Sequence, residues 1–156
     1  MASDDRDTPH VVAPPTVIFG GALLVGLLVD RVHRCPVPHG ELARPAGVAL
    51  MGVGAFIAIW AQLAMRRART SSLPYRPTTA LVDDGPFRYS RNPMYVAFTL
   101  LYVGSALLAK ALSPLVILPA VLAVIARGVV DREERYLAHR FGDQYRRYAA
   151  RVHRWL

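Results

Sequence analysis

The sequence predicts an all-α fold: an integral membrane bundle of about four transmembrane helices with a cytosolic amphipathic C-terminal helix, built by residues 1–156 as one domain. Two observations predict it. Hydrophobic residues make up 53% of the chain, yet the formal net charge is +8. Nearly all Lys and Arg residues lie between long apolar runs and not inside them. This separation indicates that the basic chain binds a membrane bilayer and not nucleic acid.

Four apolar runs have about the length of a transmembrane helix. They cover residues 11–29, 46–65, 94–109 and 111–130, the third being somewhat short. A hydrocarbon core of ~30 Å needs about 20 residues of helix. A soluble helical protein is the alternative, but four such runs in 156 residues leave too little polar surface to cover them.

The turns and small residues predict how these helices pack. Only Lys110 separates the third run from the fourth, which predicts an antiparallel hairpin. Pro119 is expected to kink the fourth helix. Small residues in the first two runs are expected to allow close helix packing. They are Gly20, Gly21, Ala22, Gly26, Gly47, Gly52, Gly54 and Ala58.

The distribution of basic residues predicts the orientation. With both termini in the cytosol, fifteen of the nineteen Lys and Arg residues lie on the cytosolic side. The loop 66–93 and the tail 131–156 then share that face. The N-terminal segment lacks the basic start and cleavage pattern of a signal peptide, so the first run is expected to remain as a helix.

The end of the loop 66–93 carries a candidate anion site. Gly85-Pro86 is a turn signal, and Asn92 and Pro93 are expected to be the N-cap and first residue of the third helix. A helix N-terminus beside Arg91 attracts a carboxylate or a phosphate.

The tail carries two carboxylates without an evident partner. Asp131 has Arg127 and Arg135 as helical neighbours, but Glu133 and Glu134 have no basic residue three or four positions away. Two interpretations are open: the glutamates contact a bound ligand, or they pair structurally with Arg88 or Arg91, which lie in the loop.

The rest of the tail shows an apolar stripe at spacings of four and three. Its members are Leu137, Phe141, Tyr145, Tyr148, Val152 and Trp155. We expect this amphipathic helix to lie on the membrane surface or against the helix ends, with an interruption at Gly142. His33, Cys35 and His39 cluster in a short loop, but too few ligands are present to predict a metal site.

Two segments resemble the isoprenylcysteine carboxyl methyltransferase and phospholipid methyltransferase superfamily, which are membrane-embedded enzymes that use S-adenosylmethionine. The first segment is Gly85-Pro86-Phe87 followed by Arg91-Asn92-Pro93-Met94-Tyr95. The second is Glu133-Glu134 followed by Phe141-Gly142, Tyr145, Tyr148 and Arg151-Val152. The resemblance covers residues 81–156, about half of the chain.

The resemblance implies S-adenosylmethionine as the cofactor and an amphipathic or lipid-soluble molecule as the methyl acceptor. It implies catalytic roles for Arg91 and Glu134. It implies cofactor contacts for Gly85, Phe87, Arg91, Asn92, Pro93, Tyr95, Glu133 and Glu134. Asn92 replaces the histidine of the isoprenylcysteine enzymes and cannot act as a general base near neutral pH.

Two alternatives stay open beside this assignment. Gly52-Val53-Gly54 is similar to a glycine pair attributed to cofactor binding in phospholipid methyltransferases, although helix packing explains the same residues. A non-catalytic four-helix membrane protein that binds a lipid or a protein partner is the alternative function. The sequence does not indicate the oligomeric state or which acceptor is methylated.

Overall fold

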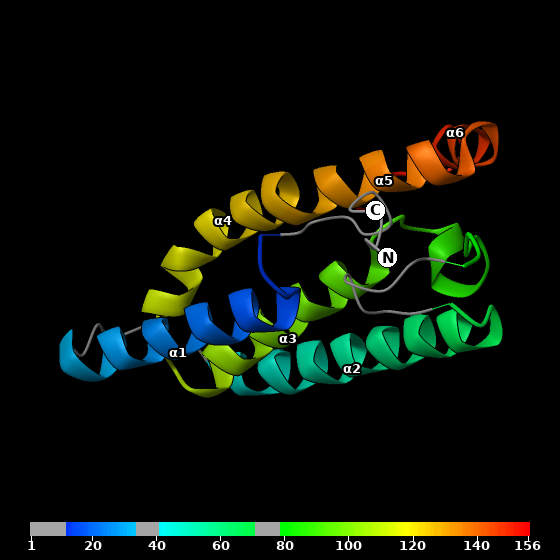
Figure 1. The fold of residues 1–156 in the computed structure, drawn as a ribbon. Helices are drawn as coiled ribbons and strands as arrows, with labels where there is room; N and C mark the ends of the chain where they lie inside the picture. The colour runs from blue at the N-terminus through cyan, green and yellow to red at the C-terminus, as the bar shows by residue number, and fades with distance from the viewer. Residues whose placement is uncertain (1–11, 34–40, 71–78) are drawn as a thin grey trace.

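The computed structural model describes residues 12–33, 41–70 and 79–156 and confirms the all-α prediction (Figure 1). No β-strand occurs in these three ranges. The helices are α1 (Pro15–His33), α2 (Ala43–Arg67), α3 (Pro93–Leu108), α4 (Ser113–Ile125), α5 (Asp131–Phe141) and α6 (Asp143–Ala149). A 3₁₀-helix, η1 (Gly85–Arg88), precedes α3, and a π-helical turn, η2 (Ala126–Val130), joins α4 to α5.

Three helices are long and apolar enough to cross a membrane. They are α1, α2 and the continuous helical segment Ser113–Phe141. α3 is apolar but has only 16 residues, which corresponds to about 24 Å of helix and is shorter than the ~30 Å hydrocarbon core. Three of the four predicted spans are therefore confirmed as helices long and apolar enough to cross a membrane, and a full crossing by α3 stays a prediction.

The first helix extends beyond its predicted end at Val29 and includes Asp30. One carboxylate oxygen of Asp30 accepts hydrogen bonds from the backbone amides of Leu112 and Ser113, both at 3.1 Å, and from the Ser113 hydroxyl at 3.0 Å. Backbone amides at a helix N-terminus have no partner within their own helix. Asp30 therefore caps α4 from the neighbouring helix, and this contact fixes the start of α4 to α1.

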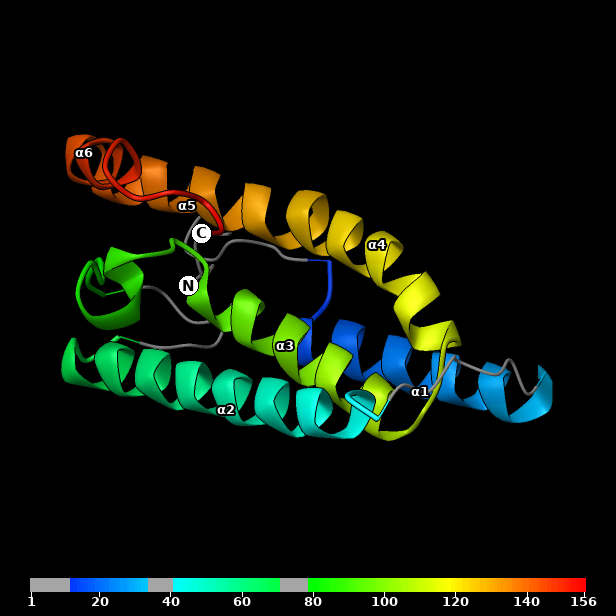
Figure 2. The ribbon, with the colours of Figure 1, turned by 180° about the vertical axis from the view of Figure 1, so that it is seen from behind.

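α3 lies between the other membrane helices (Figures 1 and 2). α2 packs along α3, whereas α4 packs mainly along α1 and has few contacts with α3. The two helices of the predicted α3–α4 hairpin thus make few direct contacts with each other. The physical reason is the attachment of α4 to α1 through Asp30 and through Gly26, where an added Cβ would lie 2.7 Å from the Cα of Pro114.

Glycines explain the close approach of α2 and α3. A Cβ on Gly47 would lie 3.1 Å from the Gly104 carbonyl oxygen, and one on Gly54 would lie 3.0 Å from the Ala97 carbonyl oxygen. The packing interpretation therefore holds for these residues and for Gly26. It does not hold for Gly20, Gly21 and Gly52, where an added Cβ would meet no atom of the described residues within 4 Å.

Two alanine substitutions in α1 test this packing. Gly26→Ala is expected to lower the free energy of unfolding by about 1–3 kcal/mol, because the new methyl group would overlap the backbone of Pro114. Gly21→Ala is the matched control and is expected to be neutral or stabilising by up to about 1 kcal/mol, since alanine favours helix and the space is open. Thermal unfolding in detergent measures both; equal melting temperatures would contradict the packing of α1 on α4.

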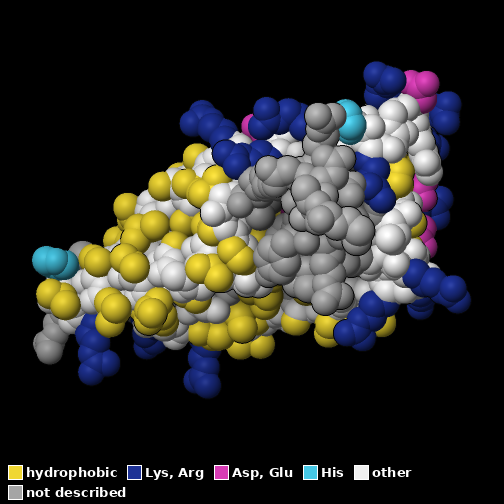
Figure 3. All heavy atoms as spheres, in the orientation of Figure 1, with side chains coloured by type: hydrophobic (Ala, Val, Ile, Leu, Met, Phe, Trp, Pro, Cys, Tyr) yellow, Lys and Arg dark blue, Asp and Glu magenta, His cyan; other side chains and the backbone are white. Residues whose placement is uncertain are grey.

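The interior is small and the outer surface is largely apolar. A buried cluster joins α1, α3 and the segment α4–η2; its members are Phe19, Tyr95, Tyr102, Val121, Ile125, Val129 and Val130. Exposed hydrophobic side chains line the outer faces of α1, α2 and α4. Figure 3 shows hydrophobic side chains over much of the molecule, with most of the visible acidic side chains at the end that carries α6. This distribution matches a multi-pass membrane protein.

Candidate functional site

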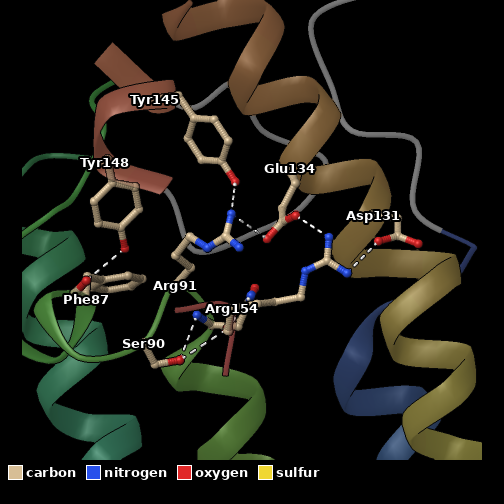
Figure 4. A network of polar contacts seen from close by, with 9 residues as sticks. Phe87, Ser90, Arg91, Asp131, Glu134, Tyr145, Tyr148 and Arg154 are labelled. Atoms are coloured by element: carbon tan, nitrogen blue, oxygen red, sulfur yellow. Dashed lines mark hydrogen bonds and ion pairs between the residues drawn. The ribbon is translucent and has the colours of Figure 1, made fainter. Parts of the chain in front are cut away.

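The candidate site lies where the N-terminus of α3 meets the start of α5 and the C-terminal tail (Figure 4). Residues from the loop before α3 and from α5 are about forty positions apart in the chain, and the fold brings them into contact. The site is therefore formed by the same two segments that the sequence singled out.

Arg91 and Glu134 form an ion pair at the centre of the site. The guanidinium Nη1 of Arg91 lies 3.2 Å from the Oε1 of Glu134, and the two side chains are only 17% and 15% exposed. The same Nη1 donates a hydrogen bond of 3.5 Å to the hydroxyl of Tyr145. Of the two structural partners proposed for the glutamates, Arg91 and not Arg88 is the one that the structure shows.

Arg154 is a second cation on the same carboxylate. Its guanidinium donates to Oε2 of Glu134 and also lies 3.0 Å from a carboxylate oxygen of Asp131. The expected partners of Asp131, Arg127 and Arg135, do not pair with its carboxylate; Arg135 instead donates to its backbone carbonyl. Sequence reasoning missed Arg154, because nothing in the linear order marks one tail arginine among several.

Hydrogen bonds to the backbone hold the tail in place. The carbonyl of His153 accepts from the backbone amide of Arg91 at 2.9 Å, and the carbonyl of Arg154 accepts from the side-chain amide of Asn92 at 2.9 Å. The Ser90 hydroxyl donates to the same Arg154 carbonyl at 3.4 Å. Asn92 is the N-cap residue of α3, as predicted, but its side chain makes no capping hydrogen bond because it binds the tail.

Glu133 has a different partner. The hydroxyl of Tyr95, which is buried, lies 2.9 Å from both carboxylate oxygens of Glu133. The two glutamates thus face different groups: Glu133 faces a neutral phenol, and Glu134 faces two guanidinium groups.

The other predicted site residues lie at the edges of this network. Gly85 has a φ of +57° and packs close to α2, with the Trp60 indole nitrogen 3.2 Å from where a Cβ would be. The backbone carbonyl of Phe87 accepts from the Tyr148 hydroxyl at 2.8 Å. Pro93 is the buried first residue of α3. These contacts are structural, and cofactor contact by Gly85, Phe87 or Pro93 stays a prediction.

The apolar stripe of the tail turns inward at Gly142. Gly142 has a φ of +50°, a conformation that favours glycine, and it ends α5 and begins α6. Tyr145 and Tyr148 are buried against the site, and Trp155 packs on the core cluster. Of the two placements expected for this stripe, the structure shows the one against the helix ends, with the predicted interruption at Gly142. The helix is broken, and the tail folds back onto the N-terminus of α3.

Burial controls the ionisation of the two tyrosines of α6. It raises the pKa of the Tyr145 hydroxyl above its ordinary value, and the nearby Glu134 carboxylate raises it further, while Arg91 acts in the opposite direction. Burial also raises the pKa of Tyr148. Both hydroxyls are consequently protonated at physiological pH and serve as neutral hydrogen-bonding groups.

Comparison with known sequences identifies the family. Residues 42–144 match the model of the phospholipid methyltransferase family, which is well over half of the chain. The chain belongs to the phospholipid methyltransferase family. A segment of 35 residues is 51% identical to an uncharacterized protein of Haemophilus influenzae and covers 22% of the present chain. The match spans only 56% of that relative's length.

The match to the phospholipid methyltransferase family includes both halves of the central ion pair. Arg91 and Glu134 lie inside the matched range 42–144, whereas Tyr145 and Arg154 lie beyond it. The contacts of Tyr145 and Arg154 with the central ion pair are therefore known from the structure and not from the family match.

Two buried polar atoms of this phospholipid methyltransferase family member lack a hydrogen-bond partner among the described residues. They are Nε of Arg91 and Oε1 of Glu134; the second atom makes the ion pair with Nη1 of Arg91 at 3.2 Å but accepts no hydrogen bond. Buried polar groups are usually paired, so such atoms in a site indicate a place for a ligand. S-adenosylmethionine carries an anionic carboxylate and cationic sulfonium and ammonium groups, and this donor and acceptor set fits it.

The remaining predicted sites do not join this centre. In the triplet Gly52-Val53-Gly54, Gly54 packs against α3, so helix packing explains this glycine. A Cβ on Gly52 would meet no atom of the described residues within 4 Å, so packing does not explain Gly52. Cys35 and His39, from the loop with too few ligands to predict a metal site, lie outside the described residues.

Proposed function

We propose that the protein is an S-adenosylmethionine-dependent methyltransferase that acts on an amphipathic or lipid-soluble acceptor at the cytosolic membrane surface. One observation carries the proposal: in a phospholipid methyltransferase family member, Arg91 and Glu134 form a mostly buried ion pair in which Nε of Arg91 and Oε1 of Glu134 make no hydrogen bond with any described residue. A pair that served packing alone would be expected to satisfy these atoms.

The cofactor supplies an activated methyl group: the acceptor's lone pair bonds to the methyl carbon, and the sulfonium sulfur keeps the electrons of the bond that breaks. The protein has to align the two molecules and keep out water. A carboxylate or thiolate acceptor loses no proton in this reaction. An amine acceptor must lose one, and Glu133 can receive it.

The residues of the site have distinct proposed roles. Arg91 binds the carboxylate of the cofactor, and Glu134 binds a cationic group of it. Tyr95 holds the carboxylate of Glu133 in place through its hydroxyl. Asn92 cannot act as a base, and its side-chain amide is already bonded to the tail carbonyl of Arg154.

The proposed arrangement also includes the membrane. The acceptor enters from the bilayer along the apolar outer faces of the helices, and the cofactor enters from the cytosol. The excess of basic residues in the loop 66–93 and in the tail supports placing the site and both termini on the cytosolic side, with α3 as a fourth, shorter span.

Equilibrium binding tests the proposed function. The detergent-purified protein is expected to bind S-adenosylhomocysteine saturably, with a Kd between about 1 µM and 1 mM, a range typical of enzyme substrates. Isothermal titration calorimetry measures it. Transfer of a labelled methyl group from S-adenosylmethionine to a panel of phospholipid, prenylcysteine, thiol and fatty-acid acceptors then identifies the acceptor class. Folded protein that binds no ligand at about 10 mM, far above this range, would refute the proposal.

A further inference from the structure

Two arginines, Arg91 and Arg154, contact the carboxylate of Glu134, and their side chains differ in solvent exposure. Arg91 is mostly buried and is held by Tyr145 as well as by Glu134. The side chain of Arg154 is 38% exposed, and its second partner, Asp131, is 40% exposed. Glu134 itself is only 15% exposed, but it keeps the ion pair with Arg91 at 3.2 Å, so the Arg154 guanidinium can leave Glu134 without leaving a buried carboxylate unpaired.

Asp131 provides a second position for the guanidinium. It lies one helical turn before Glu134 on α5 and already contacts Nη1 of Arg154 at 3.0 Å, while the other nitrogen, Nη2, contacts Glu134. A small rotation of the side chain can therefore free Oε2 of Glu134 and keep the ion pair with Asp131. No charge needs to be left without a partner in this exchange.

The backbone of the tail need not move in this exchange. The carbonyls of His153 and Arg154 are bonded to the backbone amide of Arg91 and to the side chain of Asn92. Only the long Arg154 side chain has the freedom to change partner. The exchange is a change of rotamer and leaves the fold intact.

We propose that the Arg154 guanidinium is an exchangeable counter-ion of Glu134, displaced to Asp131 by the sulfonium of S-adenosylmethionine and restored when the sulfur becomes neutral. This inference rests on the proposed function. Arg154 is then a positioning residue that acts through Glu134: it opposes binding of the cationic cofactor and not of its neutral product. Return of the guanidinium to Glu134 accompanies loss of the sulfonium charge and favours methyl transfer.

The test compares ligands that differ in charge at one position. S-adenosylmethionine carries a sulfonium, sinefungin carries an ammonium group in its place, and S-adenosylhomocysteine is neutral there. The Arg154→Gln substitution is expected to raise the affinity for each cationic ligand relative to S-adenosylhomocysteine by about fivefold or more, the lower end of typical coupling between binding events. Calorimetry measures these affinities. Arg151→Gln is the matched control, an exposed tail arginine whose guanidinium contacts the Arg147 carbonyl, and it is expected to leave the ratio unchanged.

The outcomes separate this inference from the proposed function. Equal weakening of all three ligands, or an unchanged ratio, would show that Arg154 only supports the structure and would overturn the inference. Absence of binding to the unaltered protein would instead refute the proposed function. If Arg154→Gln does not fold, Arg154→Lys replaces it. An ammonium contacts one carboxylate less firmly than the guanidinium fork does, so a shift of the ratio in the same direction, about twofold, is expected.

Discussion

Replacing Arg91 by alanine is expected to lower methyl transfer by at least about 100-fold and to weaken binding of S-adenosylhomocysteine by a similar factor, because a charged group that positions the ligand is lost. Its partner Glu134 would also be left mostly buried with only Arg154 beside it. Loss of one partner of a buried ion pair destabilises a protein by about 3–5 kcal/mol. Calorimetry and thermal unfolding measure the two effects separately.

The double variant Arg91→Ala, Glu134→Gln separates the binding role from the structural one. Removal of both charges is expected to restore part of the lost stability, since no unpaired buried charge remains, while ligand binding stays lost. Arg88→Ala is the control, because Arg88 is exposed on η1 and carries the same charge three residues away. Full ligand affinity in the Arg91→Ala variant would refute the assignment of this site.

Removal of the last six residues, 151–156, is expected to have the second large effect. The buried side chains of Ser90 and Asn92 and the backbone amide of Arg91 would lose their acceptors in the tail. Each unpaired buried group costs about 1–3 kcal/mol, so the truncated protein is expected to lose at least ~3 kcal/mol of stability. Binding of S-adenosylhomocysteine is expected to fall at least about tenfold, because the loop that carries Arg91 loses its anchor.

A shorter truncation provides the control for the tail. Leu156 is 84% exposed, so a chain that ends at Trp155 is expected to unfold at the same temperature as the full chain and to bind ligand equally well. Thermal unfolding and calorimetry on both truncations measure the difference. Retained ligand affinity without residues 151–156 would show that the tail does not organise the site.

The sequence by itself determined the class of the protein and indicated the two segments of the candidate site. Long apolar runs need a bilayer, and that requirement is readable from composition alone. The pattern from Asn92 to Pro93 likewise predicted the start of α3, because proline is suited to the first turn of a helix and few other places within it. Glu133 and Glu134 stood out because they lack helical partners, and both partners proved to be distant in the chain.

Only the tertiary structure decided which groups meet. The π-helical turn at Ala126–Val130 changes the rotation of α5 relative to α4, so the directions of Glu133 and Glu134 do not follow from a regular helical period. The break at Gly142 returns the tail to α3 and places Arg154 beside Glu134. Asp30 ties α4 to α1 across 82 residues of sequence. Such contacts depend on chain reversals and helix rotations, and local patterns record neither.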